Sequence, residues 1–465
     1  MELKQHKIML AIAVFIILQP LIDVLTTASI LYVDLPVTIG VLIRLAYLAI
    51  MAAWIVYAAL TSKKAKLYLA YLTGFALLIV INFATNYFVK DPFLMVEELT
   101  FYTKVVYFHV LFFGFLLLLE KLAERGTDTK SQLVNYFLIS ALFISAVFIV
   151  SQVTGTSLTN YARSKEGWTG WFYAGNEIGA IMAILLPLTA LFAVTRTFKV
   201  KDITQWIPFV LLSISMLALG TKVGYGGIVI VLLAVLVGSL IIWVLKLRTE
   251  KIENVRSNFF VSFILLIVLA GVTPFTPVFG NMFAHLDILG LNFEKPPVQV
   301  DEFGEVIEDT EEEKKPQITG EQMENLIFSS REQYVKNYEI QFKEAPAVQQ
   351  LFGMGYAGNY DLPERHKPLK MIEMDFHDWF YSFGLIGFLY MMAPIVYFAG
   401  LHILRFVRRI PKTFDYFHIL TGVSILLGIG ISYTAGHVLV APAVSIYMAF
   451  LLAALIVIGR AEDQR

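Results

Sequence analysis

His377 stands in the segment EMDFHDWFYSFGLIGF, residues 373–388, directly before a long apolar run. An imidazole exchanges a proton near neutral pH, which makes His377 a candidate general base. A helix is expected from Trp379 onward, with Asp378 as its N-cap. The helix dipole disfavours a charged imidazole at that end, so the pair predicts a catalytic site in which neutral His377 accepts a proton beside Asp378. The alternative is a surface histidine next to a capping aspartate.

A divalent metal ion is a second interpretation of the same segment. Glu373, Asp375 and Asp378 surround His377, and carboxylate oxygens with an imidazole suit such ions. Their spacing is loose, however, and the sequence has no second cluster of ligands. The chain also contains no cysteine, which excludes thiolate ligands and disulfides. We therefore expect neither a metal ion nor a cofactor.

Three cations are candidates for binding a diphosphate. Lys222, in LGTKVGYGG, is expected at the start of a helix, where free N–H groups and the dipole favour phosphate. Arg331, in SSREQY, offers a planar guanidinium that binds phosphate through two hydrogen bonds, and Arg163 lies in another expected loop. The alternatives are glycine-mediated helix packing around Lys222 and a salt bridge from Arg331 to Glu324 or Glu332.

Aromatic side chains accompany one of these cations. Trp168, Trp171 and Tyr173 follow Arg163 closely in the sequence. Such rings can stack on sugars, although the ordinary interpretation is an aromatic belt at the membrane interface. We expect three kinds of residue together on the extracytoplasmic face of the membrane. They are cations suited to a diphosphate, aromatics suited to sugars and a histidine suited to activating a hydroxyl.

The elements that position these residues are membrane-spanning helices. The chain is 57% hydrophobic and only 16% charged, whereas soluble domains are about 25% charged. Apolar runs of roughly 20 residues recur along the whole sequence, which is the length needed to cross a bilayer. The fold class is therefore an all-α polytopic membrane protein. The runs predict twelve helices, near residues 8–31, 37–60, 67–89, 101–119, 133–153, 176–195, 203–220, 223–245, 258–280, 379–401, 414–433 and 438–459.

The positively charged residues predict how these helices are oriented. Most of the 36 Lys and Arg residues fall into the connections that share a side with the N-terminus, and such connections stay in the cytoplasm. Both termini are therefore expected in the cytoplasm, with a multi-pass chain in the bacterial inner membrane. The organisation that follows is nine helices over 1–280, one large extracytoplasmic loop over 281–378, and three helices over 379–465.

The large loop is expected to have three parts. Residues 294–316 are acidic and poor in large apolar residues, which is typical of a solvated insertion rather than a cation site. Next, Tyr334, Tyr338 and Phe342 recur at helical spacing, together with Leu326, and predict an amphipathic helix with Arg331 at the edge of its buried face. The segment LFGMGYAGNY then has glycines typical of a tight loop.

These motifs, in this order, resemble the O-antigen ligase and O-antigen polymerase superfamily of bacterial membrane glycosyltransferases. The similar segments are GNEIGAIMAILLPL, LGTKVGYGG, SSREQY, LFGMGYAGN and HDWFYSFGLIG, which span about residues 175–390. The first 150 residues are similar only as a series of spans.

The resemblance implies an inverting, metal-independent transfer of a glycan from an undecaprenyl-diphosphate carrier to a sugar hydroxyl outside the cytoplasmic membrane. It implies that His377 deprotonates the acceptor and that Lys222 and Arg331 contact the diphosphate. Lys222 stands where the family has an arginine, and Asp378 where it has an asparagine. The expected partners are the lipid-linked donor, a glycan or lipid-linked acceptor and membrane lipids, with no nucleic acid and no nucleotide.

Two other functions remain open from the sequence. Twelve spans with both termini inside are also the format of a secondary transporter or a lipid-linked glycan flippase. Asp23, Arg44, Lys104 and His109 are the sparse charged or polar candidates for a transport path, but the two halves show no repeat. A non-catalytic assembly protein, with the acidic insertion as its partner surface, is the third interpretation.

Overall fold

The computed structural model describes residues 2–33, 37–161, 165–246, 253–288, 331–360, 370–408 and 414–463. Within these ranges the chain is helical almost throughout, and twelve helices are long and apolar enough to cross a membrane. The predicted fold class and number of spans are confirmed. The acidic insertion at 294–316 and Arg163 lie outside the described residues.

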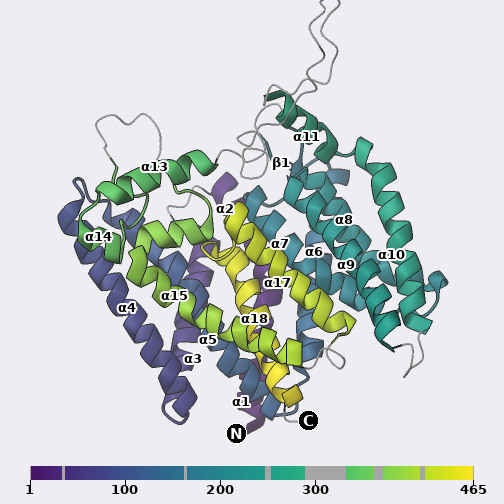
Figure 1. Cartoon of the computed structure of the whole chain (residues 1–465), viewed down its shortest axis with the longest axis horizontal. Coiled ribbons are helices and arrows are strands. Elements are labelled where there is room, and N and C mark those ends of the chain that lie inside the picture. Colours follow the sequence, from purple (N-terminus) through teal and green to yellow (C-terminus); the bar gives the residue numbers. More distant parts are fainter. Residues whose placement is uncertain are drawn as a thin grey trace, which may run out of the picture.

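The first half of the chain crosses back and forth in long helices (Figure 1). A pair of short strands joins α6 to α7. The elements are α1 (Glu2–Val14), η1 (Phe15–Leu18), α2 (Gln19–Tyr32), α3 (Ile39–Ala59), α4 (Lys63–Val89), α5 (Met95–Glu124), α6 (Thr129–Val153), β1 (Leu158–Thr159), β2 (Trp168–Gly170) and α7 (Gly175–Val194).

The second half adds the remaining spans and several shorter helices. The elements are η2 (Val200–Trp206), α8 (Ile207–Leu219), α9 (Lys222–Lys246), α10 (Glu253–Val272), η3 (Thr273–Phe275), α11 (Pro277–Ile288), α13 (Arg331–Glu344), α14 (Ala347–Phe352), α15 (Asp375–Arg408), α17 (Tyr416–Thr434) and α18 (Pro442–Asp463). Both termini lie at one end of the bundle, and α11, α13 and α14 lie at the other (Figure 1).

Helices α5, α7 and α18 form the centre of the bundle. They are buried along most of their length, and their side chains there are large and apolar, such as Phe112 and Phe115 on α5 and Phe450 on α18. Helices α4 and α10 lie at opposite edges and expose apolar side chains to the surroundings (Figure 1). A soluble protein would not expose such faces, so the pattern fits a lipid environment.

Helix α15 is broken in its first half, at Gly384. This glycine has φ 66° and ψ −174°, a conformation that residues with a side chain rarely adopt. At the break, carbonyls of α15 accept hydrogen bonds from the glycine-rich loop instead of from the helix itself. Met354 N donates to Tyr381 O at 2.9 Å, and Gly355 N donates to Ser382 O at 3.0 Å. Irregular backbone inside a membrane protein needs such internal partners. The predicted close-approach loop is thereby confirmed.

Helix α13 is the described part of the predicted amphipathic helix. Tyr338 is buried, and Tyr334, Val335 and Phe342 pack beside it against Phe380 and Tyr381 of α15. Leu326 lies outside the described residues. The prediction of an apolar face with Arg331 near its edge is confirmed for the part that is described, because Arg331 is the first residue of α13 and contacts the segment before α15.

Several helix starts differ from the sequence prediction, among them those of α5 (Met95 rather than 101), α15 and α18. Helix α15 begins at Asp375 rather than at 379, and α18 begins at Pro442 rather than near 438. The polar residues Asp375 and Asp378 suggested a loop, but both carboxylates are buried and bonded to backbone. The apolar residues Val438 and Leu439 suggested a span, but they form the loop that Asp375 binds.

Candidate active site

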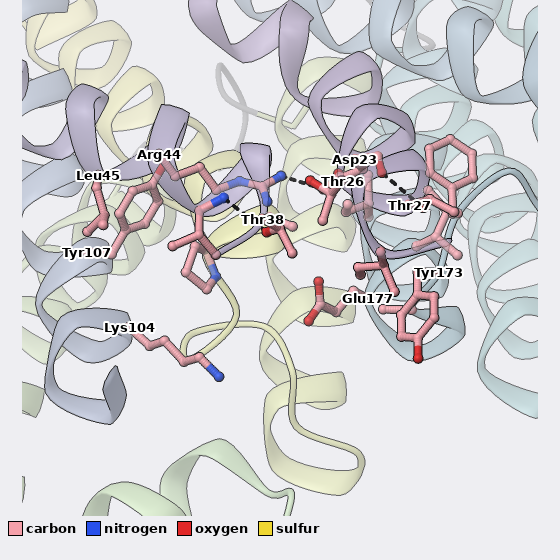
Figure 2. A pocket seen from close by; sticks show the side chains of 18 of the residues that line it. Asp23, Thr26, Thr27, Thr38, Arg44, Leu45, Lys104, Tyr107, Tyr173 and Glu177 are labelled. Carbon is pink, nitrogen blue, oxygen red and sulfur yellow. Dashed lines mark hydrogen bonds and ion pairs between the residues drawn. The ribbon is translucent and has the colours of Figure 1, made fainter. Parts of the chain in front are cut away.

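A cavity with two adjoining lobes, lined in part by charged side chains, lies beside α5. The α3 lobe has a volume of about 390 Å³ and is lined by residues of α2, α3, α5 and α7 (Figure 2). The Glu373 lobe has a volume of about 430 Å³ and is lined by α5, by the residues before α15 and by the loop before α18. Both lobes share the lining residues Thr100, Lys104, Glu177 and Pro442, so they adjoin each other.

The cavity belongs to the end of the bundle that lies away from both termini. The segment that leads into α15 and the loop between α17 and α18 are at that end, next to α13 (Figure 1). Charged residues of α5 and α7, which are within candidate membrane spans, also line the cavity. Ionisable side chains in such positions are costly and commonly mark a substrate site.

Glu373 is the most highly connected side chain of its lobe. Its Oε2 lies 3.3 Å from Nη2 of Arg331 and 3.9 Å from Nε2 of His437, and its Oε1 lies 3.7 Å from Nζ of Lys370. The carboxylate is 28% exposed, so it is partly shielded from water but still accessible. A carboxylate in a cavity is a candidate proton acceptor, and the three cationic or basic groups around Glu373 favour its ionised form.

The charges of Glu373 and His437 depend on each other. Burial alone would raise the pKa of Glu373, but His437, Lys370 and Arg331 outweigh it and hold this pKa below the usual 4.5. Burial alone would lower the pKa of His437, but Glu373 outweighs it and raises this pKa above the usual 6.5. Near neutral pH the carboxylate is therefore ionised beside a readily protonated imidazole.

The backbone at both residues is strained. Glu373 has φ 63° and His437 has φ 62°, and among the described residues only one other residue with a side chain, Ala357, has a positive φ. Such conformations cost about 1–3 kcal/mol each and persist where the surrounding structure enforces them, often at active sites. The two strained residues line the same lobe and contact each other, which sets this pair apart from ordinary surface ion pairs.

Two buried carboxylates at the start of α15 hold these strained segments in place. The first is Asp375, whose Oδ2 accepts three hydrogen bonds from the segment around His437. The donors are Ser432 Oγ (2.9 Å) and the backbone N–H groups of Val438 (3.0 Å) and Leu439 (2.7 Å).

Asp378 binds the other segment. It accepts from Ile372 N at 3.0 Å through Oδ1 and from Met374 N at 3.2 Å through Oδ2. One carboxylate thus holds the loop that carries His437, and the other holds the segment that carries Glu373.

The α3 lobe is lined by hydroxyls and a buried ion pair. Arg44 Nη2 lies 2.5 Å from Asp23 Oδ1 (Figure 2). Arg44 Nε donates to Gln19 Oε1 at 3.1 Å. The second oxygen of Asp23 and the hydroxyl of Tyr107 are buried without a hydrogen-bond partner among the described residues. Of the transport candidates, His109 instead lies in the core, where its Nδ1 contacts a backbone carbonyl at 3.1 Å.

His377 does not line either lobe. Its ring packs beside Tyr433, with ring centres 5.8 Å apart, and its Nδ1 is buried without a hydrogen-bond partner in the described part of the chain. Asp378 does line the Glu373 lobe, but both of its oxygens accept from backbone rather than from His377. Nor does Asp378 cap the helix as expected, because the helix starts earlier. The role of His377 as the base stays a prediction.

The predicted cations are not all near the cavity. Arg331 contacts Glu373 and so reaches its lobe, whereas Lys222, the first residue of α9, lines neither lobe. Of the nearby aromatics, Tyr173 lines the α3 lobe, whereas Trp171 donates through Nε1 to a threonine hydroxyl at 2.8 Å. The described residues contain no group of three or more His, Cys, Asp or Glu side chains placed to hold a metal ion.

Four residues of the cavity were not expected as part of a catalytic site. The sequence pattern presented Glu373 only as a metal ligand and Lys104 only as a transport residue, and it did not single out Glu177 or His437. For Glu177 and Lys104 a signal was present, because each is a charge inside an apolar span. For His437 there was none, since its pairing with Glu373 depends on the way the chain folds.

The helices that can span a membrane form a bundle, and a cavity lined in part by charged side chains lies toward one end of it. This arrangement defines a polytopic membrane protein that acts on a partly polar substrate. The chain matches the family model described as O-antigen ligase like membrane protein over residues 5–461. It therefore belongs to that family, and a membrane glycosyl-transfer role follows from the membership. Searches of curated proteins and of solved structures found no match.

Proposed function

We propose that the protein transfers a glycan from an undecaprenyl-diphosphate carrier to a sugar hydroxyl of a cell-surface polysaccharide. Membership of the family supports a lipid-linked glycan as substrate. The observation that carries the proposal is Glu373, an ionised carboxylate held at 3.3 Å from Arg331 and 3.9 Å from His437 on the wall of a cavity of about 430 Å³. A cavity of this size accommodates a sugar ring next to a proton acceptor.

The proposed reaction is a single displacement at the anomeric carbon. The acceptor hydroxyl oxygen forms the new bond to that carbon while the bond to the carrier diphosphate breaks, and the diphosphate leaves with the bonding electrons. Glu373 takes the hydroxyl proton, and its ion-pair partners Arg331 and His437 keep it ionised beforehand. Attack from the side opposite the leaving group inverts the configuration. The base and nearby cations supply the charge stabilisation, so the proposed reaction uses no metal ion.

The extracytoplasmic face of the bacterial inner membrane is the proposed place of reaction. Both termini are at the end of the bundle away from the Glu373 segment (Figure 1), and the connections on their side carry most of the Lys and Arg residues. Such connections are retained in the cytoplasm. The cavity then opens on the opposite side, where lipid-linked glycans are joined to acceptors without a nucleotide.

A reconstituted transfer assay tests the proposal. Purified protein in lipid vesicles, supplied with lipid-linked glycan extracted from a strain lacking the gene, is expected to release undecaprenyl diphosphate and to yield an enlarged glycan. Release of undecaprenyl diphosphate without any new glycan would indicate hydrolysis and contradict the proposal. Movement of intact lipid-linked glycan across the vesicle membrane, with neither product, would favour the flippase alternative.

The lipid-linked glycans of the deletion strain distinguish polymerase from ligase. Single repeat units accumulate on the carrier if the protein is a polymerase, because chains cannot grow. Long chains accumulate if it is a ligase, because finished chains cannot leave the carrier. These two activities share the donor chemistry described above and differ only in the acceptor hydroxyl.

The pH dependence of transfer is expected to report His437. Its pKa is raised above 6.5 by Glu373, so the imidazole is protonated below that raised pKa and loses its charge above it. Protonated His437 is one of the nearby cations that stabilise charge in the proposed reaction, so activity should hold near neutral pH and fall as the pH rises through the raised value. On the acid side, loss is expected only below 4.5, where Glu373 gains a proton.

The variant His437→Gln checks this assignment. Glutamine keeps a polar side chain but cannot titrate, so the alkaline fall in kcat/KM should disappear while the acid limb remains. If kcat/KM of His437→Gln still fell at the same alkaline pH as in the native protein, another group would cause that fall. This result would contradict the proposed role of the imidazole.

A further inference from the structure

Lys104 is the cation that both lobes of the cavity share. It lies on α5, is exposed to the open space of the cavity, and makes no hydrogen bond or ion pair with any described residue. Figure 2 shows its ammonium group extending into this space, which Glu177 also lines. A charged side chain within a membrane span is costly unless it faces a polar cavity or a partner. The Glu177 carboxyl interacts with Lys104 electrostatically but forms no ion pair with it, so the position of Lys104 suits a negatively charged ligand.

The other cations of the cavity are already engaged. Arg44 pairs with Asp23 at 2.5 Å in the α3 lobe. Arg331 pairs with Glu373 at 3.3 Å, so it lies on the same side of the reaction centre as the proposed base. In an inverting displacement the leaving group departs on the side opposite the nucleophile. A cation for the leaving group must therefore be separate from the Glu373 cluster, and Lys104 forms no ion pair with it.

The surroundings of Lys104 suit a lipid diphosphate. Thr100 lies one helical turn earlier on the same face of α5 and adds a hydroxyl donor close to the lysine. The lining of the α3 lobe also includes apolar side chains such as Ile30 and Leu45, as the first isoprene units would need. The acidic residues of the Glu373 lobe, such as Glu97 and Glu177, are placed to accept hydrogen bonds from sugar hydroxyls.

We infer that Lys104 binds the diphosphate of the lipid-linked donor at the junction of the two lobes. The α3 lobe then takes the start of the lipid, and the Glu373 lobe takes the reacting sugar and the acceptor. This inference rests on the proposed function, since it names the residue that neutralises the leaving group of that reaction. Preorganised cations next to a departing diphosphate stabilise the charge that builds up there.

Binding of undecaprenyl diphosphate to the full-length protein in lipid nanodiscs tests the inference. Lys104→Gln is expected to weaken this binding roughly 10- to 100-fold, as loss of a charge-assisted hydrogen bond implies. Lys104→Arg, which keeps the charge, should retain most of the affinity. Undecaprenol, which lacks the phosphates, should bind the native protein and Lys104→Gln equally. The matched control is Lys121→Gln on the same helix, whose lysine pairs with Glu124 on the surface.

The outcomes separate this inference from the proposed function. If the native protein prefers undecaprenyl diphosphate to undecaprenol and Lys104→Gln keeps that preference in full, the inference is overturned and the proposed function stands. If the native protein shows no preference for the diphosphate, both are overturned. An equal loss in Lys121→Gln would trace the effect to the net charge of the protein and would also overturn the inference. An unchanged melting temperature of Lys104→Gln establishes that it is folded.

Discussion

Replacing Glu373 by glutamine is expected to lower turnover in the transfer assay by roughly 10²- to 10⁴-fold, the usual contribution of a general base. Glutamine has nearly the same shape and still fits between Arg331 and His437, but it cannot accept the proton of the acceptor hydroxyl. The affinity for undecaprenyl diphosphate should change little, because Glu373 does not contact the leaving group in the proposed arrangement. The rate of glycan formation with saturating substrates is the measurement.

His377→Ala and Glu339→Gln complete this experiment. Glu339 is an exposed residue of α13 that pairs with Lys343 at 2.6 Å, so its replacement controls for loss of an acidic group near the site. His377 lies outside both lobes and packs beside Tyr433, so His377→Ala should retain much more activity than Glu373→Gln. The reverse order, with His377→Ala inactive and Glu373→Gln active, would restore His377 as the base and refute the assignment to Glu373.

Replacing Asp375 by alanine is expected to lower the free energy of unfolding by at least about 3 kcal/mol and to abolish most transfer, because three buried donors are left unpaired and each costs about 1–3 kcal/mol. The change leaves the N–H groups of Val438 and Leu439 and the hydroxyl of Ser432 buried without their acceptor. The loop that carries His437 would then lose its attachment to α15. The melting temperature in detergent and the transfer rate are the two measurements.

A capping aspartate provides the comparison for Asp375. Asp128 caps α6 at the surface and accepts from Lys130 N at 3.0 Å, so Asp128→Ala should cost only about 1 kcal/mol and leave transfer intact. If Asp375→Ala melted at the native temperature and kept its activity, the attachment of the His437 loop through this carboxylate would have no energetic importance. If Asp375→Ala lost activity but kept the native melting temperature, the carboxylate would act only by positioning His437 and not by stabilising the fold.

The spans could be predicted because each depends on its own residues. A run of apolar side chains about 20 residues long has few alternatives to a membrane helix, so helices such as α9 and α17 follow from local composition. The close-approach loop was predictable for a similar reason, since Gly353, Gly355 and Gly358 all adopt a positive φ that few other residues tolerate. The amphipathic face of α13 followed from its helical spacing.

The start of α15 could not be predicted in the same way. Asp375 and Asp378 are acidic, and acidic residues before an apolar run normally indicate a solvated loop or a cap. Here both side chains accept hydrogen bonds from backbone N–H groups, Asp378 from the residues just before it and Asp375 from Val438, which is distant in the sequence. Local pattern contains no information about such a partner, so the helix was expected to start at 379 although it starts at 375.

The sequence by itself indicated the twelve helices of the described residues that are long and apolar enough to cross a membrane, and the family of O-antigen ligase like membrane proteins, because hydrophobic length and short motifs are local properties. Only the tertiary structure decided which acids and bases meet. Within one short segment the sequence favoured His377 as the base and presented Glu373 only as a metal ligand, but folding brings His437 and Arg331 to Glu373 and leaves His377 beside Tyr433. Proton transfer requires contact, and contacts between distant segments exist only in the folded chain.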